Sequence, residues 1–195
     1  MEARRNLSGT MPESLMTADD LLRLPLPGKQ TELIRGTLIV REPPGTWHGA
    51  LAARLSARLT VFGEQGGLGM VFSQDTGFKI ASQPDTVRAP DVAFIKEDRL
   101  HGIPDRGYAE LAPDLVAEIV SPNDRPGEVL AKVADWLQAG TTLVWVIDPA
   151  RRIARVYRSD GSESVLSEGD ALDGEDLLPG FACRLDELLR RQGEG

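Results

Sequence analysis

The chain has 195 residues, of which 41% are hydrophobic, and it carries a formal net charge of −8. This length suits one domain, and the apolar fraction is that of a folded globular protein rather than a disordered one. No apolar run approaches the ~20 residues of a membrane helix, and no secretory signal opens the chain. The single Cys183 allows no internal disulfide, so we expect a cytoplasmic protein with a buried, inert thiol.

The acidic balance also weighs against broad, non-specific binding of nucleic acid. Such binding depends on Lys and Arg side chains that neutralise phosphates. A local basic cleft remains compatible with the composition, because the potential that matters is the one at the site.

The first part of the chain predicts a tail and then a small α/β unit. Residues 1–16 are polar and unpatterned, and we expect a mobile tail there, followed by a single domain over residues 17–191. Thr17 and the two acids after it are typical of a helix start. Residues 30–41 predict a hairpin that turns at Arg35-Gly36. A helix is expected from about residue 48 to 62, followed by a glycine-rich turn.

The rest of the chain predicts a sheet. Strands are expected at 70–73, 77–80 and 92–95, and after a polar loop (96–113) comes a strand over 115–120. A helix over 128–139 ends at Gly140, and a strand at 141–147 and an edge strand at 153–158 follow. One more strand pair and a short helix around 185–191 close the chain. The strand–helix–strand unit indicates a parallel pair, and the order of elements indicates a mixed α/β fold with a central sheet flanked by helices.

Two acids interrupt apolar strands, Asp91 before Val92-Ala93-Phe94-Ile95 and Glu118 within residues 115–120. A buried carboxylate without a partner costs several kcal/mol or takes up a proton. A shared divalent cation is the simplest common partner, and Mg²⁺ prefers hard oxygen ligands of this kind. We therefore expect the two acids to lie on neighbouring strands.

An ordered set of short motifs connects these acids to a known family. In chain order the motifs are Leu24-Pro25, Glu32-Leu33-Ile34-Arg35-Gly36, His48 at a helix start, Arg88-Ala89-Pro90-Asp91-Val92, residues 113–122 around Glu118, Lys132, Trp145-Val146-Ile147-Asp148-Pro149 after Gly140, and Leu178-Pro179-Gly180-Phe181. The set resembles the bacterial Uma-type family of restriction endonucleases, within the PD-(D/E)XK nuclease superfamily.

The resemblance implies a restriction-endonuclease-like fold and a Mg²⁺-dependent endonuclease that hydrolyses phosphodiester bonds of DNA, with Mn²⁺ as a possible substitute. It implies that Asp91 and Glu118 hold the metal and that the Ile119 carbonyl adds a ligand. Cutting two strands is simplest with two sites related by a two-fold axis, so we expect a homodimer. The strand at 141–147 and the loop at 96–113 are candidate contributors to its interface.

One position departs from the superfamily pattern, because Val120 stands where a lysine is usual. The resemblance places the lysine on the following helix, at Lys132. It also places an acid of the site at Glu32, and His48 could shuttle protons as a neutral imidazole. Trp136 stands where the family often has Tyr. The expected catalytic residues are thus Asp91, Glu118, Lys132, Glu32 and His48.

Simpler interpretations stay open for each residue. Asp91 could begin a strand, Glu118 could pair with Arg88, and Lys132 could be a solvated helix residue. Glu32 and His48 could lie at the surface. The alternative function is a catalytically degenerate nuclease fold that binds nucleic acid or protein, which the acidic charge and Val120 favour. A metal-dependent hydrolase of small phosphoesters is a third possibility.

Overall fold

The structure is a computed structural model that describes residues 15–24 and 26–191. The tail predicted for residues 1–16 lies outside the described residues as far as residue 14. The helices are α1 (Ala18–Arg23), α2 (Thr46–Gln65), α3 (Pro126–Gln138) and α4 (Leu185–Leu189), with a 3₁₀ turn η1 (Glu97–Arg99). The strands are β1 (Gln30–Ile34), β2 (Thr37–Arg41), β3 (Gly69–Ser73), β4 (Phe78–Ala81), β5 (Thr86–Arg88), β6 (Val92–Lys96), β7 (Leu115–Ile119), β8 (Leu143–Asp148), β9 (Ile153–Arg158), β10 (Glu163–Leu166), β11 (Ala171–Asp173) and β12 (Ala182–Arg184).

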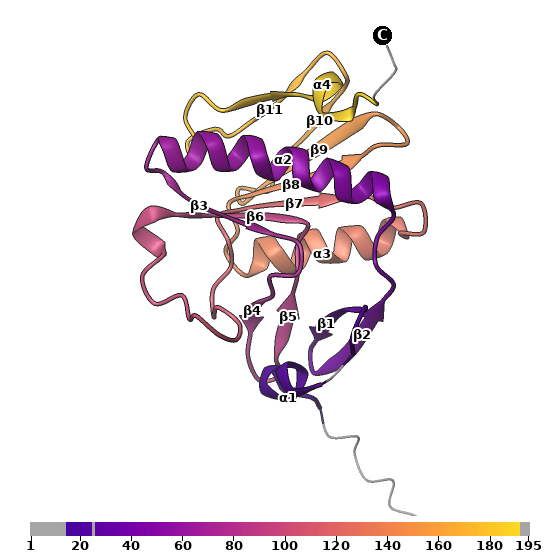
Figure 1. Cartoon of the computed structure of the whole chain (residues 1–195), viewed down its shortest axis with the longest axis vertical. Coiled ribbons are helices and arrows are strands. Elements are labelled where there is room, and N and C mark those ends of the chain that lie inside the picture. Colours follow the sequence, from indigo (N-terminus) through magenta and orange to yellow (C-terminus); the bar gives the residue numbers. More distant parts are fainter. Residues whose placement is uncertain (1–14, 25, 192–195) are drawn as a thin grey trace, which may run out of the picture.

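A six-stranded sheet in the order β10-β9-β8-β7-β6-β3 forms the centre of the molecule (Figure 1). The pair β7–β8 is parallel and is joined through α3, whereas the other pairs are antiparallel. Helix α2 and the C-terminal segment cover one face of the sheet, and α3 covers the other (Figure 1). The predicted mixed α/β fold with a central sheet flanked by helices is confirmed.

The central strands are buried on both faces, which explains their nearly continuous apolar sequences. Phe94, Leu115 and Trp145 point into the core under α2. Val116 and Val144 point into the second core, where Trp136 of α3 packs. Glu118 lies in the middle of this apolar pattern, and its burial therefore needs partners.

A smaller sheet in the order β2-β1-β5-β4 packs with α1 below the central sheet (Figure 1). The predicted hairpin is confirmed, and both turn residues have positive φ, 49° at Arg35 and 78° at Gly36. This is the backbone of a type I′ turn, whose twist matches that of paired strands. Thr17 and Asp20 form a capping box at the start of α1, as the sequence indicates.

Two sequence predictions need correction. Helices α2 and α3 begin two residues earlier than expected, at Thr46 and Pro126; proline fits a first helical turn, where its missing N–H is not needed. The strand predicted at 141–147 cannot contribute to a dimer interface. It corresponds to β8, which lies between β7 and β9 with both faces buried.

None of the helices among the described residues is long and apolar enough to cross a membrane.

Candidate active site

The predicted site residues meet at one end of the central sheet. Glu118 lies near the end of β7, and Asp91 directly precedes β6, the antiparallel neighbour of β7. Val92 is paired with Ala117, so Asp91 stands beside the end of the strand that carries Glu118. The two acids thus lie at adjoining ends of two neighbouring strands, with Glu118 inside β7 and Asp91 one residue before β6. The first turn of α2 and the inner face of α3 approach the same end, bringing His48 and Lys132.

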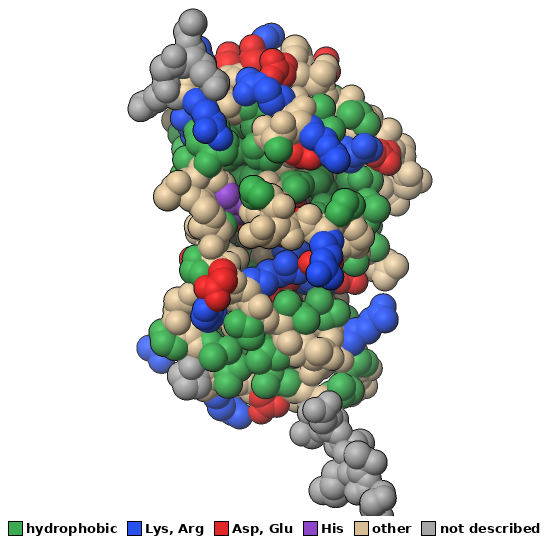
Figure 2. Space-filling view, turned by 90° about the vertical axis from the view of Figure 1, so that its right-hand side faces the viewer, with side chains coloured by type: hydrophobic (Ala, Val, Ile, Leu, Met, Phe, Trp, Pro, Cys, Tyr) green, Lys and Arg blue, Asp and Glu red, His purple; other side chains and the backbone are tan. Residues whose placement is uncertain are grey.

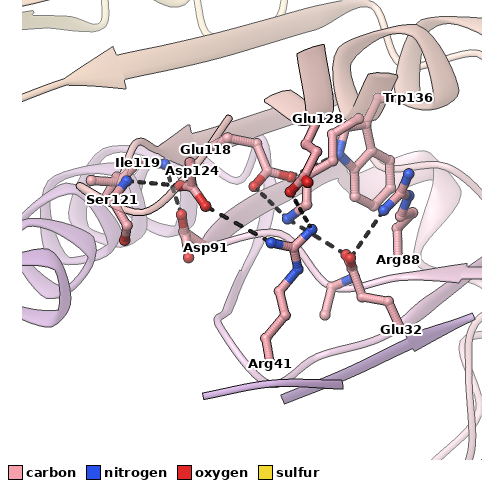
Figure 3. Close-up of polar contacts among 12 residues, drawn as sticks. Glu32, Arg41, Arg88, Asp91, Glu118, Ile119, Ser121, Asp124, Glu128 and Trp136 are labelled. Carbon is pink, nitrogen blue, oxygen red and sulfur yellow. Dashed lines mark hydrogen bonds and ion pairs between the residues drawn. The ribbon is translucent and has the colours of Figure 1, made fainter. Parts of the chain in front are cut away.

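Asp91 is held from two sides. Its Oδ2 accepts a hydrogen bond from the backbone N–H of Ile119 at 2.7 Å (Figure 3). The same oxygen lies 3.1 Å from His48 Nε2. The first contact fixes the carboxylate against β7, next to Glu118. Asp91 is therefore more than a residue that begins a strand, since its side chain ties β6, β7 and α2 together.

Glu118 is buried, and both of its oxygens have donors. Oε1 accepts from the indole Nε1 of Trp136 at 2.9 Å (Figure 3), and Oε2 accepts from Lys132 Nζ at 3.1 Å. Removal from water raises the pKa of Glu118, and the charge of Lys132 opposes this shift. The negative charges of Asp91 and Glu32 raise it further. Lys132 compensates only part of the cost of a buried negative charge on Glu118, and a bound cation would compensate more of it.

Lys132 is drawn into the same cluster. Its ammonium lies 3.1 Å from Glu118 and 3.5 Å from Glu32, and only 18% of its side chain is exposed. Burial alone would lower the pKa of Lys132, but the charges of Glu118 and Glu32 outweigh burial and raise the pKa well above its usual value. The interpretation of Lys132 as a solvated helix residue is wrong.

Glu32 is buried on β1 rather than exposed on the hairpin. It accepts from Arg88 Nη1 at 3.0 Å (Figure 3) and from the N–H of Ala89 at 3.3 Å. Arg88 also donates through Nε to Asp135 at 3.0 Å. The alternative in which Glu118 pairs with Arg88 is therefore wrong, because Arg88 pairs with Glu32 and Asp135. Glu32 therefore connects the smaller sheet to Lys132.

His48 lies in the first turn of α2 and is largely buried. Burial lowers the pKa of its imidazole, but the hydrogen bond to Asp91 and the charge of Asp91 outweigh burial, so the net shift is upward. Its Nδ1 is buried and has no hydrogen-bond partner among the described residues. The surface interpretation of His48 is wrong, and the histidine touches the acid expected to bind metal.

A pocket opens beside this cluster. Residues of β2, the end of β7, the loop after it and α3 line this pocket, namely Arg41, Glu118, Ile119, Val120, Asp124, Glu128, Val129 and Lys132. Figure 2 looks from the side on which α2 begins, and the surface there is hollowed between the central and smaller sheets, with Lys, Arg, Asp and Glu side chains around the hollow. Val120 reaches the pocket, and Lys132 supplies the ammonium that the strand lacks.

The donors present suit a hard cation with few protein ligands. Among the described residues, no three His, Cys, Asp or Glu side chains form a metal-binding group. Two neighbouring carboxylates remain, Asp91 and Glu118, and each carboxylate oxygen can accept more than one contact. Mg²⁺ is commonly bound in this way, by one or two carboxylates with water and substrate phosphates completing the shell.

Sequence reasoning missed three parts of the site. Trp136 lies on the apolar face of α3 and packs in the core, yet its indole also binds Glu118. Asp135, which holds Arg88, and Arg41, at the pocket mouth, carried no signal in the sequence. The substitution of Trp136 for the family's usual Tyr was the one available hint, because both residues offer a polar hydrogen on an aromatic ring.

Comparison with known proteins identifies a family and a similar fold. A family model for Uma2, described as "Putative restriction endonuclease", matches residues 18–186. The fold is similar to the crystal structure of a putative nuclease belonging to DUF820 from Anabaena variabilis ATCC 29413. The two share 22% identity, with a TM-score of 0.78 over 89% of this chain and 97% of that one. No curated protein matches the chain. The chain therefore belongs to the Uma2 family of putative restriction endonucleases, as its motifs indicate.

Proposed function

We propose that this protein is a metal-dependent endonuclease that hydrolyses phosphodiester bonds of DNA, with Mg²⁺ or Mn²⁺ held by Asp91 and Glu118. The observation that carries the proposal is the meeting of these two acids at adjoining strand ends, with Lys132 bound to Glu118 beside an open pocket. Family membership supports a nuclease, and the chemistry of the donors supports the choice of metal.

Each residue has a distinct task in this proposal. A bound Mg²⁺ would polarise the phosphate and lower the pKa of an attacking water. Trp136 fixes the orientation of Glu118 through its hydrogen bond. Lys132 places a positive charge where charge develops on the phosphate, an effect worth a few kcal/mol in a water-poor site. His48 stands within reach of Asp91 and can accept or deliver a proton near the phosphate.

The metal is tested first, because a degenerate nuclease fold need not bind one. Calorimetric titration with Mn²⁺ and with Mg²⁺ should give one site in the wild type and none in Asp91→Asn or Glu118→Gln. Asp148→Asn is the matched control, since Asp148 ends the neighbouring strand β8, accepts backbone N–H bonds in its own turn and pairs at 3.6 Å with the exposed Arg151, away from the site residues. Its metal binding should equal that of the wild type.

Cleavage is tested in parallel on supercoiled plasmid, linear duplex, single-stranded DNA and RNA. Cutting of DNA that needs the metal and is lost in Asp91→Asn is the expected result. Metal binding without cleavage of any of these polymers would overturn the endonuclease and leave a hydrolase of smaller phosphoesters. Absence of metal binding would favour the non-catalytic alternative.

A homodimer is part of the proposal, because two copies of the site can cut two strands. The loop that contains η1 stays a candidate for the interface, whereas β8 does not. Light scattering at micromolar concentration checks the stoichiometry, and a stable monomer would contradict this part of the proposal.

A further inference from the structure

The mouth of the pocket carries a second basic side chain, Arg41, for which the proposed chemistry has no task. Arg41 and Lys132 are the two basic residues that line the pocket. We infer that Arg41 binds a backbone phosphate of the DNA that enters the site, and that Asp124 and Glu128 hold its guanidinium in place until the phosphate arrives. This inference rests on the proposed nuclease function.

The contacts of Arg41 are loose. Nη1 lies 3.8 Å from Asp124 Oδ1 and Nη2 lies 3.5 Å from Glu128 Oε2, both longer than the 2.7–3.2 Å typical of an N–H···O hydrogen bond. The two nitrogens reach two different carboxylates, so no bidentate pair forms (Figure 3). The buried Nε has no hydrogen-bond partner among the described residues. The guanidinium of Arg41 therefore makes no short hydrogen bond to either acid, and its Nε–H remains unpaired among the described residues.

Lys132 provides the contrast. Its ammonium neutralises two buried carboxylates, and breaking such buried pairs is costly. The side chains of Arg41 and Glu128 are 32% and 46% exposed, and exposed ion pairs contribute little to stability. Arg41 is thus the lining cation that can change partners at small cost, and its planar fork matches the oxygens of a phosphate.

Neither acid would lose all its partners if Arg41 moved to a phosphate. Asp124 Oδ2 also accepts from the N–H of Ser121 at 2.8 Å, and Glu128 lies 3.9 Å from the exposed Arg125. Arg41 itself stays anchored, because it is the last residue of β2 and is paired with Gln30 in the hairpin. The exchange needs a side-chain movement and no change of fold.

The location of Arg41 suits a phosphate near the reacting one. Its side chain reaches from the smaller sheet across to the loop after β7, and it lines the same pocket as Glu118 (Figure 3). A strand of DNA lying in the hollow between the two sheets would meet Arg41 on one side and the metal-binding acids on the other. The charge of Arg41 would offset part of the repulsion that the acidic side chains of the pocket exert on a phosphate.

The test is fluorescence anisotropy with a short fluorescein-labelled DNA duplex and its separate strand, in a buffer with Ca²⁺ in place of Mg²⁺. Arg41→Gln should weaken binding about tenfold, as for a lost charge-assisted hydrogen bond. It should also lower the slope of log affinity against log salt by about one. Arg41→Lys, which keeps the charge but not the fork, should fall between Arg41→Gln and the wild type. Arg23→Gln is the control, because it removes one exposed charge from α1 and should bind like the wild type.

Glu128→Gln separates a phosphate-binding arginine from a purely structural brace. Loss of this acid should tighten DNA binding more in the wild-type background than in the Arg41→Gln background if Arg41 is being held for a phosphate, whereas the loss of a negative charge beside a structural brace would act equally in both backgrounds. Wild-type affinity in Arg41→Gln, or an equal effect of Glu128→Gln in both backgrounds, would overturn the inference and leave the nuclease proposal standing. Failure of the wild type to bind either DNA probe would overturn both. If Arg41→Gln does not fold, Arg41→Lys takes its place, alone and as the second background for Glu128→Gln.

Discussion

The indole Nε1 of Trp136 donates a hydrogen bond of 2.9 Å to Oε1 of Glu118, across the boundary between α3 and the central sheet. Trp136 is fully buried, so its ring packs in the core while its one polar hydrogen orients the acid proposed to bind metal. The same residue thereby serves both the stability of the fold and the geometry of the site.

This double role predicts the effect of Trp136→Phe. The ring is largely kept, but Glu118 loses a donor and its pKa should rise further, so affinity for Mn²⁺ should fall about 10- to 100-fold, as for other outer-shell partners of metal ligands. Calorimetry measures the affinity. Trp145→Phe is a close control, because Trp145 is equally buried but its Nε1 has no hydrogen-bond partner among the described residues. Equal loss of metal affinity in both variants would contradict the assigned role.

Lys132→Ala should destabilise the protein as well as stop cleavage. Helix propensity alone predicts little change of stability, since alanine suits a helix. The structure changes that expectation, because removal of Lys132 leaves Glu118 and Glu32 buried without their shared cation. Breaking a buried pair costs about 3–5 kcal/mol, and the partial exposure of Lys132 places the cost at the lower end. Urea unfolding in EDTA measures it.

A double-mutant cycle identifies the origin of that cost. Lys132→Ala combined with Glu118→Gln should be less destabilised than the sum of the two single variants, because the uncompensated charge is gone. Mg²⁺ should likewise restore part of the stability of Lys132→Ala, since a cation near Glu118 replaces the ammonium. Additive effects that do not respond to metal would show that Lys132 acts only by packing.

The sequence predicted the architecture where periodicity is strong. Leu51, Leu55 and Leu59 on one helix, and the apolar runs of β6, β7 and β8, are consequences of local patterns. Asp91 and Glu118 stood out because acids in such runs need a partner. The three-residue strand β5 and the early start of α2 escaped prediction, because short elements and helix ends carry weak signals.

The partners of the site residues could not be predicted, for a different reason. Arg88 was considered for Glu118 but binds Glu32 and Asp135, which are 56 and 47 positions away in the chain. Such choices depend on how α3 and the smaller sheet pack on the central sheet, and no local pattern encodes that geometry. Trp136 illustrates the same limit, since helical periodicity places its ring in the core without naming the acid its indole reaches.

Cys183 should react slowly with thiol reagents in the native protein. Burial raises the pKa of its thiol, although the nearby Arg58 opposes the shift, and the side chain is only slightly exposed. The reactive thiolate is therefore scarce at pH 8 in the native protein and more abundant in the unfolded chain. Iodoacetamide labelling followed by mass spectrometry should show slow modification that rises with pH and accelerates in urea. Rapid native labelling at pH 8 would contradict the expected inert thiol.

Glu32 should act through Lys132 rather than through the metal. Its carboxylate contacts Arg88, the N–H of Ala89 and Lys132, so Glu32→Gln leaves two cations with weaker partners. We expect lower stability in urea and a lower cleavage rate at saturating metal, with Mn²⁺ affinity close to that of the wild type. Glu42→Gln, one residue beyond the same hairpin, is the matched control. Glu42 is exposed and, among the described residues, pairs with Lys29 alone, in an exposed ion pair of the kind that contributes little to stability. A large loss of Mn²⁺ affinity in Glu32→Gln, without a comparable loss in Glu42→Gln, would instead place Glu32 among the metal ligands.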